Sequence, residues 1–220
     1  MKLGLIGQGF VGSAVKEVMS NYYEVNTYDL EPHKCNCSTL RELVNISDVI
    51  FVCVPTPMKK DGSCDTSIVE TVVNDINETV NCNQDGKIVI IKSTVPPGPT
   101  NRLDKKYKHI NVIFNPEFLT EANFVDDFKN QDRIIIGGKR PHTTKVKQMY
   151  SIAFPQVHII KTSSTIAETV KYMTNTFLAT KVSFANEIHM ICDKLNIDYD
   201  KVQEYATLDT RLGISHWAVP

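Results

Sequence analysis

The sequence predicts an α/β fold: a doubly wound, mostly parallel sheet followed by one long helix. Three observations lead to this prediction. Short apolar runs alternate with helical periodicity up to about residue 161, a glycine-rich turn joins the first run to the first helix, and residues 166–195 keep helical spacing without Gly or Pro. Strands that alternate with helices form βαβ units, and the strands of such units pair in parallel.

The predicted strands are short apolar runs, and six or seven of them are enough for one doubly wound domain. They cover residues 2–6, 23–28, 49–54, 87–91, 111–114, 133–137 and 157–161. Between them, apolar residues recur every three or four positions, which predicts helices over 11–19, 39–45, 66–80, 100–106 and 143–151. Thr39 or Ser38 is expected to cap the second of these helices.

The pattern changes after residue 161. Residues 166–195 are long for a globular helix, and a short helix is expected over 198–206. We therefore predict a Rossmann-type domain over 1–161, and over 162–220 the long helix and the start of an incomplete, all-helical dimerisation domain. Apolar positions such as Val170, Phe177 and Phe184 exceed one narrow stripe, so we expect this helix to pack against its twin in a homodimer.

Composition limits the classes of function. The formal net charge is −1, so the protein has no strong positive electrostatic field that would attract nucleic acid or an acidic membrane. No window reaches about 18 uninterrupted apolar residues, and no basic segment precedes an apolar one, so we expect neither a membrane span nor a signal peptide. Six cysteines are too sparse for a disulfide scaffold and lack zinc-site spacing. We expect reduced thiols, no metal and a cytoplasmic location.

The hexapeptide GQGFVG, residues 7–12, follows a strand and opens a helix. This context is typical of a dinucleotide-binding turn: Gly7 permits the tight turn, Gly9 lets a pyrophosphate approach the backbone, and Gly12 lets the helix pack on the strand. Free N–H groups and a partial positive charge at the helix start favour phosphate. The alternative is a structural turn without a ligand.

The second predicted strand ends at Asp29. A carboxylate there accepts hydrogen bonds from ribose hydroxyls and repels a 2′-phosphate, which favours NAD, although the nearby His33 and Lys34 leave NADP open. Ligands on such sheets lie beyond the carboxyl ends of the strands. Segments 54–57, 92–96 and 115–119 should therefore form the walls of one crevice and place polar side chains there: Thr56, Ser93, Thr94, Asn115 and Glu117.

Seven segments, in order along the chain, resemble the nucleotide-sugar 6-dehydrogenases of the UDP-glucose/GDP-mannose dehydrogenase family. They are residues 7–12, 52–57 (VCVPTP), 92–98 (KSTVPPG), 115–121 (NPEFLTE), 132–138 (DRIIIGG), 167–175 (AETVKYMTN) and 209–213 (DTRLG). The resemblance implies oxidation of the C6 alcohol of a nucleotide sugar to an acid, with two NAD reduced. UDP-glucose is the first candidate substrate, ahead of GDP-mannose and UDP-N-acetylmannosamine.

The resemblance also implies roles for single residues. Thr94 and Glu117 would handle protons or position a water at C6, Lys171 would stabilise the developing oxyanion, and Asn175 would hold the sugar or a water. Phe118 and Leu119 would support the sugar through their backbone, and Arg211 would reach a substrate in the partner subunit. The expected NAD-binding residues, with Glu121 by the nicotinamide, are Gly7, Gly9, Phe10, Val11, Gly12, Asp29, Lys34, Val54, Pro55, Thr56, Ser93, Thr94 and Glu121.

General chemistry is compatible with these roles. Lys171 and Asn175 are four residues apart and share one helix face, and an ammonium beside a developing alkoxide contributes about 3–4 kcal/mol. Taken singly, each residue also fits an ordinary role: Glu117 as a loop carboxylate, Lys171 on a solvated helix face, and Arg211 as a surface charge.

In this family the nucleophile is a cysteine in a Gly-Gly-x-Cys segment, and this sequence ends at residues 215–220 before such a segment. None of the six cysteines has a recognisable activating environment. We therefore expect a fragment or truncated protein that binds NAD without full turnover. Two alternatives stay open: a non-catalytic NAD-binding module, and a β-hydroxyacid dehydrogenase-type reductase, which shares the early turn and the Lys/Asn pair. Segments 92–98 and 115–121 argue against the reductase.

Overall fold

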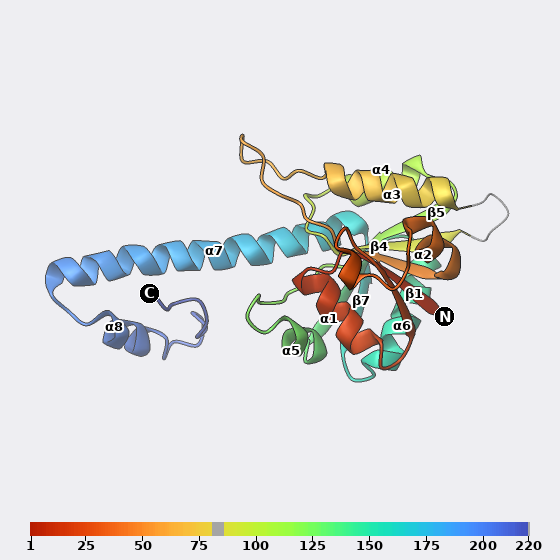
Figure 1. The fold of residues 1–220 in the computed structure, drawn as a ribbon. Helices are drawn as coiled ribbons and strands as arrows, with labels where there is room; N and C mark the ends of the chain where they lie inside the picture. Colours follow the sequence, from red (N-terminus) through yellow and green to blue (C-terminus); the bar gives the residue numbers. More distant parts are fainter. Residues whose placement is uncertain (81–85, 220) are drawn as a thin grey trace. The chain divides into compact units, whose positions relative to one another are not determined.

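The computed structural model of the chain describes residues 1–80 and 86–219, and these described residues form two compact units that divide between Lys171 and Tyr172 (Figure 1). The boundary between the units lies inside a helix. The boundary predicted from the sequence, between residues 161 and 162, instead lies at the end of the last strand.

A seven-stranded sheet in the order β2-β1-β3-β4-β5-β6-β7 forms the centre of the first unit. The strands are β1 (Lys2–Ile6), β2 (Glu24–Tyr28), β3 (Val49–Val52), β4 (Lys87–Ile91), β5 (Ile110–Phe114), β6 (Arg133–Gly137) and β7 (His158–Thr162). All neighbouring strands are parallel except β5 and β6, which are antiparallel. The predicted α/β fold with a mostly parallel sheet is confirmed.

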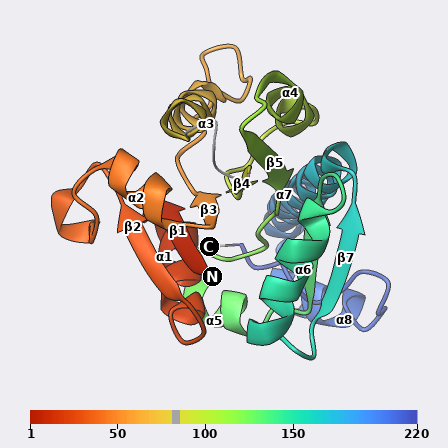
Figure 2. The same ribbon diagram turned by 90° about the vertical axis from the view of Figure 1, so that its right-hand side faces the viewer.

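Helices cover both faces of this sheet (Figure 2). One layer is α2 (Leu40–Ile46), α3 (Ser67–Thr79) and α4 (Pro99–Lys106), and the other is α1 (Phe10–Met19), α5 (Phe124–Lys129) and α6 (His142–Ala153). Thr39 caps α2 through a bond from the Glu42 N–H, as its sequence position suggests. The short helix α5 and the 3₁₀ turn η1 (Pro32–Lys34) were not predicted.

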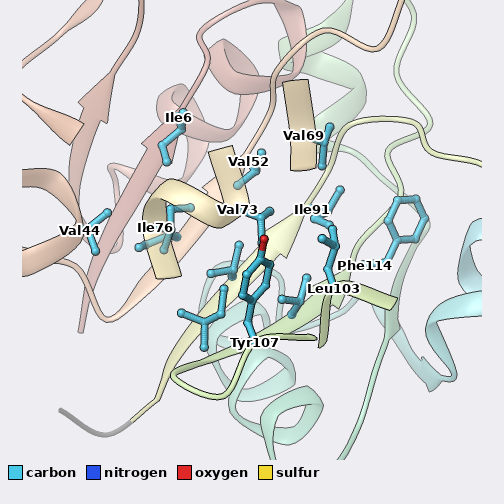
Figure 3. Packing of buried hydrophobic residues seen from close by; sticks show 14 of the residues in the cluster. Ile6, Val44, Val52, Val69, Val73, Ile76, Ile91, Leu103, Tyr107 and Phe114 are labelled. Atoms are coloured by element: carbon cyan, nitrogen blue, oxygen red, sulfur yellow. The ribbon is translucent and has the colours of Figure 1, made fainter. Parts of the chain in front are cut away.

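The core consists of two apolar clusters, one on each side of the sheet. In β3, Ile50 and Val52 pack into the cluster beneath α2–α4, whereas Val49 and Phe51 pack into the opposite cluster. Figure 3 shows the first cluster, in which Tyr107 and Leu103 lie near Ile91 and Val73. A strand buried on both faces is apolar at every position, which explains the unbroken apolar runs in the sequence.

The ends of four strands are aligned across the sheet. Ile6, Val52, Ile91 and Phe114 are register partners in turn. The next residue of each strand continues the ladder: the N–H groups of Cys53, Lys92 and Asn115 donate to the carbonyls of Ile6, Val52 and Ile91 at 2.8–2.9 Å. The first residues after these strands therefore form one row at the carboxyl edge, which includes Gly7.

The helix α7 (Ser164–Leu195) begins in the first unit and continues in the second. In the second unit it is followed by α8 (Tyr199–Ala206), which Asp198 caps. A small core of Ala185, Cys192 and Tyr199 joins these two helices, and the Lys181 ammonium donates to the Leu212 carbonyl at 2.9 Å. Among the described residues, no helix has the apolar length that crossing a bilayer requires.

Candidate active site

The turn of residues 7–12 has the backbone that its glycines predict. Gly7 has φ +87°, and a Cβ there would lie 2.6 Å from the Cys53 carbonyl oxygen. A Cβ on Gly12 would lie 2.0 Å from the Gly7 carbonyl oxygen. Both positions require glycine because the backbone of the helix packs directly on the strand end.

Gly9 differs from its neighbours, since a Cβ there would meet nothing within 4 Å. It precedes α1, whose start has no side-chain cap, so the first-turn N–H groups face this open space. Room beside the backbone and a helix N-terminus together suit a diphosphate. Phe10 is half exposed and packs on Phe124 of α5 at 5.5 Å between ring centroids.

Asp29 lies at the end of β2, beside this turn. Its carboxylate accepts the Gln8 N–H at 2.6 Å and the Glu31 N–H at 3.0 Å. Partial burial raises the pKa of Asp29, but these bonds and the Lys34 charge outweigh burial, and the net pKa is lowered. Lys34 is paired with Glu31 at 2.6 Å. Asp29 thus stays ionised, and the Lys34 ammonium is already partnered by a carboxylate.

The segments after β3 and β4 supply further predicted cofactor residues. The Ser93 hydroxyl donates to the Val54 carbonyl at 2.6 Å, which ties the two strand ends together. Thr94 is half-buried, and its carbonyl accepts the Cys64 thiol at 3.7 Å. Val54 and Thr56 are half-buried, whereas Pro55 is exposed. Val11, in the first turn of α1, is also half-buried.

Glu117 and Lys171 form an ion pair of 2.6 Å, and their side chains are only 12% and 4% exposed. The second Glu117 oxygen accepts the Leu119 N–H at 2.7 Å, so that backbone donor, expected to hold a sugar, is bound to Glu117 in this structure. The Lys171 ammonium lies 5.6 Å from the Phe118 ring centroid, and Arg133 lies 4.4 Å from the same centroid. Glu117 and Lys171, which the sequence predicted for one site, are therefore in direct contact in the fold.

Lys92 is a buried polar residue that the sequence analysis did not single out. Its ammonium donates to the Asn115 side-chain oxygen at 2.9 Å, and the Tyr150 hydroxyl donates to the same oxygen at 2.6 Å. Asn115 in turn donates to the Ile135 carbonyl at 2.7 Å. The available signal was a lysine directly after the apolar run of a buried strand, where an unpartnered charge is costly.

A cavity of about 320 Å³ opens beside this cluster. Lys92 and Glu117 contribute to its wall, together with Phe118, Leu119 and residues of α5 and of the segment that leads into β6. The exposed Glu121 is not part of this wall. The other two predicted substrate residues belong to the second unit: Asn175 is exposed on α7, and Arg211 is exposed and paired with Asp209 at 2.5 Å.

Glu168 fixes the start of α7. Its fully buried carboxylate accepts the N–H groups of Gly98 and Thr100 at 2.7 and 3.0 Å, at the N-terminus of α4. A carboxylate at a helix N-terminus is stabilised by the helix dipole. Because Lys171 follows Glu168 by one turn of α7, this contact also fixes where Lys171 leaves the helix.

Cys53 is the cysteine in the row of strand ends. Burial raises its pKa to about 12, which keeps the thiol protonated and a poor nucleophile. Cys82 lies outside the described residues. Within the described ranges, no group of three or more His, Cys, Asp and Glu side chains is arranged to hold a metal ion.

Comparison with known proteins confirms the family. Residues 24–154 match the model of the UDP-glucose/GDP-mannose dehydrogenase family, NAD binding domain, and residues 165–218 match the model of its central domain. The chain belongs to this family. Its first domain is therefore an NAD-binding domain, and the predicted cofactor is confirmed. The turn of residues 7–12 precedes the matched range, so its assignment rests on its own geometry.

Two relatives in Bacillus subtilis illustrate the similarity. UDP-glucose 6-dehydrogenase TuaD is 34% identical over 177 residues, 77% of this chain and 38% of that protein. The putative UDP-glucose 6-dehydrogenase YtcA is 31% identical over 97% of this chain and 57% of its own length. The chain therefore spans between about two fifths and three fifths of these relatives.

Solved structures of the same family have the same fold. A UDP-glucose dehydrogenase from Pyrobaculum islandicum is 28% identical, with a TM-score of 0.88 over 98% of this chain and 58% of that one. A GDP-mannose dehydrogenase from Pseudomonas aeruginosa, solved as a ternary complex, is 25% identical with a TM-score of 0.85 over 99% of this chain. A 3-hydroxyisobutyrate dehydrogenase from Mycobacterium tuberculosis, at 14% identity and a TM-score of 0.78, shares the fold alone.

Proposed function

We propose that this chain contributes the NAD-binding site and part of the sugar site of a nucleotide-sugar 6-dehydrogenase, with UDP-glucose as the first candidate substrate. The buried Glu117–Lys171 pair carries this proposal, because it places an acid–base group and a cation beside a cavity at the carboxyl edge of the sheet. The names of the relatives TuaD and YtcA support the choice of sugar nucleotide.

The cofactor would be held at the other end of the same row of strand ends. Gly9 and the start of α1 would take the diphosphate, and Asp29 would take the ribose hydroxyls. When bound, NAD supplies the acceptor for the hydride that leaves C6. Thr56, Thr94 and Glu121 belong to the same proposed cofactor site.

Proton transfer at C6 would depend on Glu117 and Lys171. Glu117 is an acceptor for the hydroxyl proton, directly or through one water. Lys171 has donor hydrogens beyond the one shared with Glu117, so it can stabilise the oxygen as negative charge develops. Removing one such donor typically lowers kcat by about 10²–10³-fold. Asn175 and the partner subunit's copy of Arg211 are proposed to hold the sugar nucleotide.

We further propose that the chain binds NAD without completing the second oxidation. That step needs a nucleophilic thiolate. In the row of residues that directly follow the strands the cysteine is Cys53, and burial keeps its thiol protonated. Stopped-flow measurement of NADH with UDP-glucose tests this: NADH binding is expected, whereas sustained formation of two NADH per sugar by residues 1–220 would contradict it.

Two alternatives are separated by the same assays. A β-hydroxyacid dehydrogenase-type reductase, favoured by the fold shared with 3-hydroxyisobutyrate dehydrogenase, predicts NADH formation with 3-hydroxyisobutyrate and none with UDP-glucose. A non-catalytic NAD-binding module predicts that NADH binds and that UDP-glucose does not bind at all. Calorimetric titration with UDP-glucose distinguishes this module from the proposed enzyme region.

A homodimer through α7 is also proposed. In the second unit the helix exposes large apolar side chains, Met173, Phe177, Phe184 and Met190, which a partner helix would cover. Light scattering after gel filtration should give twice the mass of one chain, and a monomer at high concentration would contradict this proposal. A cytoplasmic location and a role in polysaccharide biosynthesis remain predictions.

A further inference from the structure

A second buried ammonium lies near the Glu117–Lys171 pair. The Lys92 side chain is 2% exposed and forms part of the wall of the cavity that Glu117 also lines. Its Nζ donates to the side-chain oxygen of Asn115 at 2.9 Å and to the Asn115 carbonyl oxygen at 3.4 Å. An ammonium has three donor hydrogens, so within the described structure one of them has no hydrogen-bond partner.

The contact between Lys92 and Asn115 also restricts the position of Glu117. The two residues are separated only by Pro116, whose ring fixes its own φ. The Asn115 side chain is held by Lys92, by Tyr150 and by the Ile135 carbonyl, and all three partners lie in the first unit. The segment that carries Glu117 is thus anchored at Asn115 by a charged bond, the stronger kind of hydrogen bond.

The groups that surround the Lys92 ammonium come from several elements of the first unit. Cys53 after β3 and Tyr150 on α6 face it as neutral groups, because burial raises the pKa of both. Phe128 of α5 presents its ring 5.5 Å from Nζ. Glu117 is the carboxylate that attracts the Lys92 charge, and Lys171 is a like charge that repels it. With both lysines protonated, the cluster carries two positive charges and one negative charge, which suits a substrate oxygen with developing negative charge.

We propose that Lys92 is a positioning residue: its ammonium, bonded to Asn115, fixes the direction of the Glu117 carboxylate at the sugar site. This inference rests on the proposed function for its consequence in catalysis, but the positioning itself can be measured without a substrate. Burial lowers the pKa of Lys92 to about 8, so the anchor is charged at neutral pH and loses its charge above it.

The first experiment follows the Leu119 amide, which donates to Glu117 and so reports the direction of that carboxylate. Carbon-detected NMR between pH 6.5 and 9.5 should show a shift of the Leu119 nitrogen centred near pH 8. The step should persist in Tyr150→Phe, which removes the other donor to the same Asn115 oxygen, and vanish in Lys92→Met. A step that survives in Lys92→Met, or no step in the wild-type chain, would overturn the proposal. If Lys92→Met fails to fold, Lys92→Arg, which stays charged over this pH range, replaces it and should likewise show no step.

The second experiment measures UDP-glucose binding by calorimetry at pH 7 and pH 9. The wild-type Kd should rise about tenfold between these values, and Lys92→Met should show the weaker Kd at both. NADH affinity, measured on the same samples, should stay unchanged, since the Lys92 ammonium bonds to Asn115 and is not among the proposed cofactor contacts. Equal UDP-glucose affinity in Lys92→Met and wild type would overturn the role of Lys92. No binding to the wild type would contradict the proposed substrate, and the NMR titration would still decide on Lys92.

Discussion

The turn of residues 7–12 and the cluster of Lys92, Asn115, Glu117 and Lys171 lie at the same edge of one sheet but are built in different ways. The turn is one continuous stretch of backbone, in which two glycines allow contacts of atoms that a side chain would block. The cluster consists of side chains from the ends of β4 and β5 and from α7. Gly7 and Gly12 in the turn therefore leave no room for a side chain, whereas the cluster depends on each partner keeping its charge.

Removing a charge from the cluster should have the largest effect. Lys171→Met leaves the mostly buried Glu117 carboxylate without its cation, which should lower the free energy of unfolding by about 3–5 kcal/mol. Urea denaturation followed by circular dichroism measures this loss. The control Lys147→Met, on the exposed side of α6, should stay within about 0.5 kcal/mol of wild type. Equal free energies of unfolding in the two variants would show that the Glu117–Lys171 pair does not stabilise the fold.

A pH titration should isolate the second cation. The folded-state pKa of Lys92, about 8, lies below the ordinary value of 10.5. Below pH 8 the Lys92 amine is protonated in both the folded and the unfolded chain. Burial of its charge then lowers the free energy of unfolding by the full desolvation cost. Between pH 8 and 10.5 the folded chain releases the proton first, so stability should rise relative to Lys92→Met, by about 3 kcal/mol at the upper end. Urea denaturation of wild type and Lys92→Met from pH 7 to 10 gives the difference in their free energies of unfolding. A difference that does not change with pH would refute the lowered pKa of Lys92.

The backbone turn should separate binding from stability. Gly9→Val places its Cβ in the open space beside α1, so the melting temperature should stay unchanged while the Kd for NADH rises about 100-fold. Gly12→Ala places a Cβ against the Gly7 carbonyl and should lower the melting temperature instead. Fluorescence titration and differential scanning calorimetry test both. Loss of stability in Gly9→Val would mean that the space beside Gly9 has a structural role.

The smallest predicted effect concerns the charge at the end of β2. Asp29→Asn removes the negative charge while leaving one side-chain oxygen as an acceptor, so NADH should bind about tenfold more weakly. NADPH should lose less affinity, because the group that repels its 2′-phosphate is gone. Parallel titrations with both nucleotides measure the ratio. An unchanged ratio would mean that Asp29 does not select the cofactor.

The sequence predicted elements best where local and tertiary preferences agree. Strands β1, β4 and β6 have the bounds that the apolar runs predicted. The strand predicted over residues 49–54 ends at Val52. The Cys53 N–H still bonds to the Ile6 carbonyl, and the ladder stops before Pro55 and Pro57. Helix α5 was missed since its six residues are too few for a periodic pattern, and only Phe128 is buried among them.

The same limit applies to the site. The glycine turn and Asp29 were predictable because their chemistry is local in sequence. Lys92 was not, because nothing near it in the sequence shows that Asn115 and Tyr150 would lie around its ammonium. Ser93 is still predicted to lie at the cofactor, and the sequence did not show that its hydroxyl donates to the Val54 carbonyl. Sequence position indicates which edge of the sheet a side chain reaches, and only packing decides its partner.

The Glu168 carboxylate links two segments that are far apart in the sequence. It accepts backbone donors from Gly98 and Thr100 while belonging to the same helical turns as Lys171. Local opening of the loop before α4 would leave a buried charge unbonded, so this loop and the first turns of α7 should open together or not at all. In hydrogen exchange, the Gly98 and Thr100 amides should therefore share one opening free energy with the start of α7.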